Sequence, residues 1–171
     1  DQQAEMVARV KKYKSGFAAI IGMPNVGKST LLNKIAGQKI AIISEKPQTT
    51  RNKILAIHTT DTEQIIFTDT PGIHKPHNKL GEFMVNAANE TMRDVDVLLF
   101  VIDATRPIQD VEREIVKNIA KTGLPCILVM NKVDLVEKSN LLPMIADYSS
   151  MYDFESIVPM SAKSGDGVDV L

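Results

Sequence analysis

Residues 22–29, with the sequence GMPNVGKS, constrain most strongly what this chain can fold into. They fit the pattern G-x-x-x-x-G-K-S/T, in which Gly22 and Gly27 permit backbone dihedral angles and close approaches that a side chain would block. Successive N–H groups can then turn inward on a polyphosphate, while Lys28 supplies a positive charge and the Ser29 hydroxyl offers a ligand for Mg²⁺. The pattern therefore predicts a phosphate-binding loop.

The residues on both sides of this loop predict a strand and a helix. Residues 17–21 (FAAII) are apolar, as in a buried strand that leads into the loop. Residues 29–36 have the pattern of a helix that ends before Gly37. Bound phosphates are therefore expected at a helix N-terminus.

The composition is that of an ordinary globular domain. Of 171 residues, 44% are hydrophobic and 24% are charged, so we expect one domain over residues 15–171, preceded by an extension over residues 1–14. The net charge of −1 argues against bulk electrostatic attraction to nucleic acid. The single cysteine, Cys126, favours a reducing compartment, and its apolar neighbours predict an inert core thiol. No apolar stretch approaches the roughly 20 residues of a membrane span, which favours a cytoplasmic protein.

A β-hairpin is predicted after the first helix and a long loop. Residues 38–51 are mostly polar and have no sustained period, which is typical of a functional loop. Residues 53–59 then alternate, and a turn at 60–62 leads into residues 64–68. His58 in the first strand is expected to be a solvated or hydrogen-bonded surface histidine.

The sequence Asp69-Thr-Pro-Gly72 directly follows the second strand of this hairpin. Its carboxylate therefore belongs at the carboxyl edge of the sheet, where ligand sites of open α/β sheets lie. Asp69 can hold a metal ion through water while the Gly72 N–H meets a γ-phosphate, although a simple D-x-P-G turn is an equal alternative. A second polar loop over residues 73–80 and a helix with an apolar stripe from Leu80 to Met92 are expected to follow.

The rest of the chain alternates between strands and helices. Strands are predicted at 97–102, ending in Asp103, at 126–130 and at 156–160. A helix marked by Ile108, Val111, Ile115, Ile119 and Ala120 is expected to stop at Gly123, and a short helix is expected near 141–149. This alternation implies a mostly parallel sheet with helices on both faces.

The tetrapeptide Asn131-Lys132-Val133-Asp134 follows a buried strand and so belongs at the same edge as the phosphate loop. The Asp134 carboxylate can accept hydrogen bonds from guanine N1–H and its exocyclic amine, whereas adenine offers neither donor. The stem of Lys132 can lie along the base, and Asn131 can tie this segment to the phosphate loop. The backbone N–H groups of Ser161, Ala162 and Lys163 can serve guanine O6. Taken alone, the tetrapeptide also fits a charged surface turn.

Together these stretches resemble the five motifs of translation-factor-related small GTPases. The sequence from Gly22 to Asn33, with Pro47 to Arg51 and Asp69 to His74, is similar more narrowly to the Era family, bacterial GTPases of small-subunit ribosome assembly. The resemblance implies a three-layer α/β P-loop GTPase domain with a mostly parallel six-stranded sheet and one antiparallel edge strand. It also implies that the chain stops within the last helix of that domain, without the family's C-terminal KH RNA-binding domain.

The resemblance further implies a GTP-hydrolysing switch in 16S rRNA and small-subunit assembly, which signals its state through the loops at 38–51 and 73–80. The implied ligands are GTP or GDP, Mg²⁺ and K⁺. Nucleotide is expected to contact Gly22, Pro24, Asn25, Val26, Gly27, Lys28, Ser29, Thr30, Asp69, Gly72, Asn131, Lys132, Asp134, Ser161, Ala162 and Lys163. Metal binding is assigned to Ser29, Asp69 and either Thr49 or Thr50, with Thr50 preferred by resemblance.

Hydrolysis is expected to depend on Lys28, Asn25, Thr50 and Gly72. Ile73 stands where Ras-like enzymes have a water-orienting glutamine, so Asn25 as a potassium ligand, or else His74, is expected to assist.

The KH domain would contact RNA, membrane association would be peripheral at most, and the chain would be monomeric. The alternatives are a related ribosome- or tRNA-associated potassium-activated GTPase, a P-loop kinase or ATPase, and an interaction module with a structural nucleotide.

Overall fold

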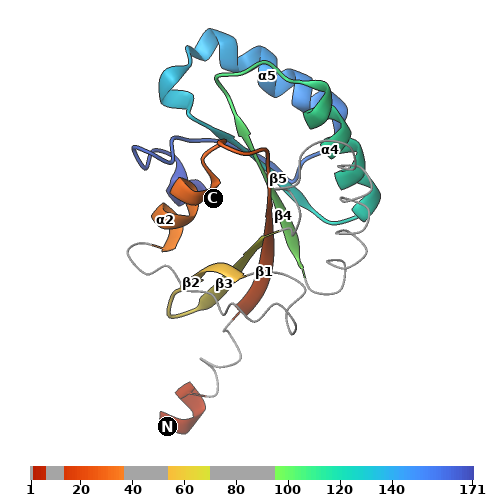
Figure 1. Cartoon of the computed structure of the whole chain (residues 1–171). Helices are drawn as coiled ribbons and strands as arrows, with labels where there is room; N and C mark the ends of the chain where they lie inside the picture. The colour runs from red at the N-terminus through yellow and green to blue at the C-terminus, as the bar shows by residue number, and fades with distance from the viewer. Residues whose placement is uncertain (1, 7–13, 37–53, 70–94) are drawn as a thin grey trace.

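The computed structural model of the chain describes residues 2–6, 14–36, 54–69 and 95–171. Its centre is a six-stranded sheet in the order β2-β3-β1-β4-β5-β6 (Figure 1). The strands are β1 Lys14–Ile21, β2 Ile54–Thr59, β3 Glu63–Asp69, β4 Val97–Asp103, β5 Cys126–Asn131 and β6 Ser156–Pro159. All neighbours pair in parallel except β2, an edge strand antiparallel to β3. The predicted α/β fold class is confirmed.

Helices cover both faces of this sheet. They are α2 Lys28–Ala36, α4 Asp110–Thr122 and α5 Lys138–Met151, with the 3-10 turns η1 Val133–Leu135 and η2 Val168–Val170. In Figure 1, α2 and the C-terminus lie on one side of the sheet, and α4 and α5 lie on the other. The described part of the chain thus has the three layers expected of this fold class.

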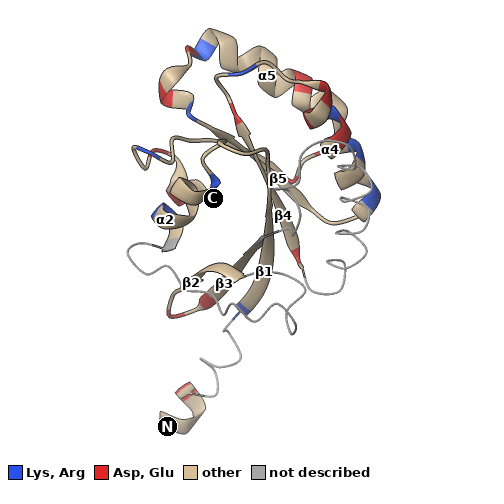
Figure 2. Ribbon diagram, in the orientation of Figure 1, with Lys and Arg blue, Asp and Glu red and all other residues tan. Residues whose placement is uncertain are grey.

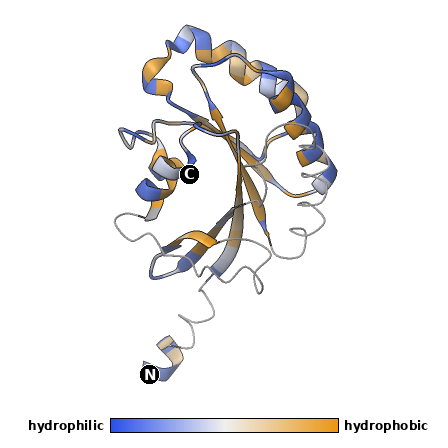
Figure 3. Cartoon of the chain, in the orientation of Figure 1, coloured by the Kyte–Doolittle hydropathy of each residue, from blue (hydrophilic) through white to orange (hydrophobic). Residues whose placement is uncertain are grey.

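The core is split by the sheet into two apolar clusters, because successive strand residues point to opposite faces. Along β4, Leu98, Phe100 and Ile102 pack beneath α4 and α5, whereas Leu99 and Val101 pack on the α2 side. Figure 3 shows the strands largely hydrophobic, while α4 and α5 alternate between hydrophobic and hydrophilic residues. Two buried faces explain the near-continuous apolar sequence of the central strands.

The predicted hairpin is present, with one irregularity. Strands β2 and β3 pair antiparallel around the turn at 60–62, and the register shifts between Ile54 and Ala56. A bulge at this point lets both Leu55 and Ala56 pack on the α2 side, which simple alternation does not predict. His58 Nδ1 lies 3.2 Å from the carbonyl oxygen of Ile35, so it is a hydrogen-bonded histidine as expected.

Helix α4 stops at Gly123 as predicted but begins at Asp110, so Ile108 of the predicted apolar stripe precedes the helix. The Gln109 N–H donates to the Glu112 carboxylate at 2.7 Å, as in a capping box, and Gly123 ends the helix at a φ of 70°. Within the helix, one residue of the predicted apolar stripe is misplaced, because Ala120 is exposed and Val116 is buried instead. A small alanine fits either face, so packing against the sheet decides the orientation.

Several predicted boundaries differ from the observed ones. Strand β1 begins at Lys14, and its Phe17 is 38% exposed rather than buried. Helix α5 spans 14 residues, longer than predicted, and accommodates Pro143 in its second turn. The predictions for residues 37–53 and 70–94 lie outside the described residues. Within the described ranges, no helix is both long enough and apolar enough to span a membrane.

Candidate nucleotide-binding site

The phosphate loop connects β1 to α2 at the carboxyl end of the sheet, as the sequence predicts. A Cβ on Gly22 would lie 2.6 Å from the Val101 carbonyl oxygen of β4, so only glycine lets the loop start this close to the sheet. Gly27 has a φ of 97°, and a Cβ there would collide with the Asn131 side chain. Both glycines are therefore required by the protein's own packing, independently of any ligand.

Two further features prepare this loop for phosphate. The Lys28 ammonium donates to the Gly22 carbonyl oxygen at 2.9 Å, which folds the lysine back across the loop. Helix α2 begins at Lys28, with Ser29 and Thr30 exposed in its first turn. The N–H groups at the start of a helix and a nearby ammonium group together form a suitable anion site.

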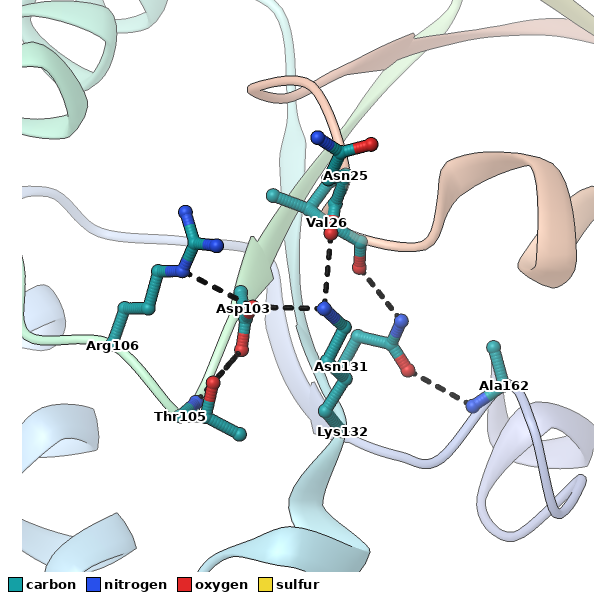
Figure 4. A network of polar contacts seen from close by, with 8 residues as sticks. All are labelled: Asn25, Val26, Asp103, Thr105, Arg106, Asn131, Lys132 and Ala162. Carbon is teal, nitrogen blue, oxygen red and sulfur yellow. Dashed lines mark hydrogen bonds and ion pairs between the residues drawn. The ribbon is translucent and has the colours of Figure 1, made fainter.

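Asn131, the last residue of β5, joins three segments. Its Nδ2 donates to the Val26 carbonyl oxygen at 2.8 Å, and its Oδ1 accepts from the Ala162 N–H at 2.9 Å (Figure 4). The side chain is buried, with 3% of the residue exposed. The contact expected between Asn131 and the phosphate loop is thus present, and the same amide also holds the segment after β6.

Lys132 reaches back across the loop from the other side. It has a φ of 65°, and its Nζ donates to the Asn25 carbonyl oxygen at 3.0 Å. Asn25 also has a positive φ, of 66°, and in Figure 4 its side-chain amide points away from this contact. Two residues in the left-handed region are therefore held by one hydrogen bond between their segments.

Asp103 is a partner of Lys132 that sequence reasoning missed. Its Oδ2 accepts from Lys132 Nζ at 2.9 Å, and its Oδ1 accepts from the Thr105 N–H at 2.9 Å and hydroxyl at 2.5 Å. Burial opposes ionisation, but the hydrogen bonds from Thr105 and Lys132 and the lysine charge outweigh it and lower the pKa of Asp103. An aspartate at the end of a buried strand, two residues before a threonine, was the available signal.

Asp134 lies beside a pocket of about 260 Å³ at this edge of the sheet. The lining residues come from the phosphate loop, α2, the end of β5 and the segments after β5 and β6: Gly27, Thr30, Asn131, Lys132, Asp134, Leu135, Ser161 and Lys163. The segments predicted to bind phosphate and base thus border one pocket. A larger cavity of about 450 Å³ beneath α2 includes no predicted site residue among its lining.

The segment 161–163 offers fewer free donors than its sequence suggests. The Ser161 N–H donates to the Asp166 carbonyl oxygen at 2.8 Å, and the Ala162 N–H donates to Asn131. Among the described residues, only the Lys163 N–H of these three has no protein acceptor. Lys163 is therefore the backbone donor that this segment leaves for a ligand.

The expected metal ligands are only partly described. Asp69 is the last residue of β3 and pairs with Ile20 of β1, and Ser29 is the second residue of α2. Thr49, Thr50, Gly72 and His74 lie outside the described residues. In the part of the chain that the structure covers, no three His, Cys, Asp or Glu side chains cluster as a metal site. Mg²⁺ with one or two protein ligands and phosphate oxygens fits this donor set better than a protein-only cage.

Comparison with known proteins identifies the family. A family model described as a 50S ribosome-binding GTPase matches residues 17–132. The chain belongs to this family of GTPases. Within it, GTPase Era from Ruminiclostridium cellulolyticum is 54% identical over 161 residues, which are 93% of this chain and 53% of the relative. The chain therefore spans about half the length of this relative.

Two solved Era structures extend the comparison. One is a crystal structure of Era with MgGDPNP and nucleotides 1506–1542 of 16S ribosomal RNA, at 42% identity and a TM-score of 0.72. The other is a variant of Aquifex aeolicus Era bound to GDP and AlF4−, at 41% identity and a TM-score of 0.71. Each matches 92% of this chain, which covers 54% of the other. The resemblance to the Era family is confirmed.

Proposed function

We propose that this GTPase-family chain binds GTP with Mg²⁺, hydrolyses it to GDP and phosphate, and acts as a switch. The observation that carries the proposal is the single pocket bordered by the phosphate loop, Asp134 and Lys163. The Asn131 side chain fixes the phosphate loop to the segment after β6, so the two halves of the pocket keep one spacing. Because the pocket is already ordered, nucleotide binding loses less free energy to ordering the protein.

Guanine is the base that the polar groups of this pocket favour. Asp134 accepts from guanine N1–H and the exocyclic amine, and the Lys163 N–H donates to O6. Adenine has no donor at these two positions, so it would leave the Asp134 carboxylate without partners. A site built to hydrogen-bond a ligand rejects an analogue that lacks those donors by a factor of about 10⁴ or more.

On the phosphate side, Lys28 and the loop N–H groups stabilise negative charge on the β and γ phosphates. Ser29, Asp69 and Thr50 would hold Mg²⁺, which neutralises charge between those phosphates. Asn25 would provide a side-chain oxygen for K⁺, supported by its exposed side chain and its positive φ. Thr50 and the Gly72 N–H would lose their partners on hydrolysis, so the loops at 38–51 and 73–80 relax together.

We further propose a role in small-subunit ribosome assembly, because the related Era structure holds a fragment of 16S ribosomal RNA. RNA contact would belong mainly to a C-terminal KH domain outside this chain. A cytoplasmic, monomeric GTPase domain fits that role. A related ribosome- or tRNA-associated potassium-activated GTPase is the second candidate, supported by the family description.

Nucleotide titration tests the proposal directly. We expect GTP and GDP to bind at least a hundredfold more tightly than ATP, measured by competition with a fluorescent GDP analogue in the presence of Mg²⁺. Tighter binding of ATP would instead indicate a P-loop kinase or ATPase. Phosphate release followed over hours separates a slow GTPase from a module whose nucleotide is structural and never hydrolysed.

A further inference from the structure

We infer that Asp103 is a positioning residue that holds the Lys132 ammonium, and through it the phosphate loop, in the arrangement that guanine nucleotides require. The inference rests on the proposed nucleotide-binding function. Each of the other described parallel strands, β1, β3, β5 and β6, is followed by a sequence motif. The inference gives a role at the site to β4, which is followed by none.

The position of Asp103 follows from strand pairing. Asp103 is the last residue of β4 and lies opposite Asn131 of β5, and the next N–H, that of Ala104, donates to the Asn131 carbonyl oxygen at 3.0 Å. Asp103 therefore lies beside the last residue of β5, and Lys132 is the next residue along that chain segment. Its side chain is 6% exposed, whereas that of Lys132 is 32% exposed. The aspartate is thus the buried and fixed partner of the pair.

Hydrogen bonds from Thr105 hold the Asp103 carboxylate in place independently of Lys132. Thr105 occupies its Oδ1 with both a backbone N–H and a hydroxyl, which leaves Oδ2 for Lys132. Arg106 also approaches Oδ2, but at 3.7 Å and with a 63% exposed side chain, so its contribution is small. The close partner of Oδ2 is therefore Lys132, as Figure 4 shows.

Lys132 links the two halves of the site. It lines the pocket together with Asp134, and its Nζ also donates to the Asn25 carbonyl oxygen in the phosphate loop. The four-carbon stem of lysine is flexible. A second acceptor at Asp103 therefore restricts the Lys132 side chain in advance and lowers the entropic cost of nucleotide binding. Without the Asp103 charge, the Asn25 carbonyl oxygen would be the one strong acceptor that Lys132 retains among the described residues.

The variant Asp103→Asn tests this role. It keeps the shape of the side chain and removes its charge, so we expect GDP and GTP affinity to fall on the order of tenfold, mainly through faster dissociation. Lys132 contacts ground state and transition state alike, so KM should rise while kcat stays within about twofold. The matched control is Asp96→Asn, which removes a carboxylate that accepts from the Phe17 N–H away from the pocket. The control should leave nucleotide affinity unchanged.

A double-mutant cycle separates positioning from a general effect on folding. In a Lys132→Met background, Asp103→Asn should cost no further GDP affinity, because the residue through which it acts is gone. The same loss in both backgrounds, or unchanged affinity in the single variant, would overturn the inference. If Asp103→Asn lowers the melting temperature too far for measurement, Thr105→Ala loosens the same carboxylate and should produce a smaller loss of GDP affinity. Unchanged GDP affinity in Thr105→Ala would then overturn the inference. Failure of the unsubstituted chain to bind GDP would instead refute the proposed function.

Discussion

Asp134 is the residue on which the choice of base depends in the proposed site. Asp134→Asn replaces an acceptor with an amide that can donate, so GTP affinity should fall at least a hundredfold and preference should move toward xanthine nucleotides, whose C2 carbonyl accepts. Competition of GDP and xanthosine diphosphate against a fluorescent nucleotide measures the switch. Glu137→Gln, an exposed acid just before α5, is the control. Unchanged GTP affinity in Asp134→Asn would refute the assignment.

Asn25 carries the prediction for the chemical step. Intrinsic GTP turnover should be slow, and faster in KCl than in NaCl at equal ionic strength, because a bound K⁺ adds positive charge where negative charge develops. Asn25→Ala should abolish the difference and leave GDP binding largely intact, since Lys28 and the loop N–H groups remain. Equal rates in both salts, or a potassium advantage that survives the substitution, would contradict this role. Loss of rate in His74→Ala alone would move it to His74.

At the scale of elements, Asn131 is where β5, the phosphate loop and the segment after β6 meet. Asn131→Ala leaves the Val26 carbonyl oxygen and the Ala162 N–H buried without partners, so the free energy of unfolding should fall by about 2 to 4 kcal/mol. Urea unfolding measures the loss. Asn140→Ala, in the exposed first turn of α5, should change it by less than about 0.5 kcal/mol. A loss of similar size in both variants would argue against the bridging role.

The loop between β6 and η2 gives a second test at this scale. Gly165 and Gly167 both have positive φ, of 88° and 80°. A Cβ on Gly165 meets nothing within 4 Å, whereas one on Gly167 would lie 2.6 Å from the Pro159 carbonyl oxygen. Gly165→Ala should therefore cost about 1 to 2 kcal/mol of stability from the backbone conformation alone. Gly167→Ala should cost about 1 to 3 kcal/mol more than Gly165→Ala, because its Cβ would also collide with the backbone. Equal melting temperatures of the two variants would contradict this expectation and show that the loop shifts to make room.

The elements show what could be predicted from sequence and what could not. The succession of strands and helices along the chain and the hairpin were predictable, because apolar runs and turn residues are local signals. The site motifs were predictable for the same reason, since each follows a strand along the chain. The contact among Asn25, Asp103 and Lys132 was not, because it depends on strand order and on where a lysine stem ends. The length of α5 was missed because Pro143 interrupts a weakly amphipathic sequence.

At the scale of the whole molecule, charge determines what this chain can bind without a further domain. The net charge is −1, and Figure 2 shows Lys and Arg interspersed with Asp and Glu over α4 and α5. Affinity for RNA comes largely from phosphates neutralised by clustered cations, and each such contact steepens the dependence on salt. The surface of α4 and α5 therefore mixes acidic and basic groups, which opposes tight binding of a polyanion there.

We accordingly expect the isolated 171-residue chain to bind a 16S ribosomal RNA fragment weakly, with a dissociation constant above the micromolar range and little change between GDP and a non-hydrolysable GTP analogue. Fluorescence anisotropy with labelled RNA at two salt concentrations measures this, and a full-length relative that retains the RNA serves as positive control. The relative should bind more tightly and lose affinity steeply as salt rises. A sub-micromolar, salt-sensitive complex of the chain alone would contradict the prediction. The basic residues between Arg9 and Lys14 would then be the first candidates, and their replacement by glutamine should flatten the salt dependence.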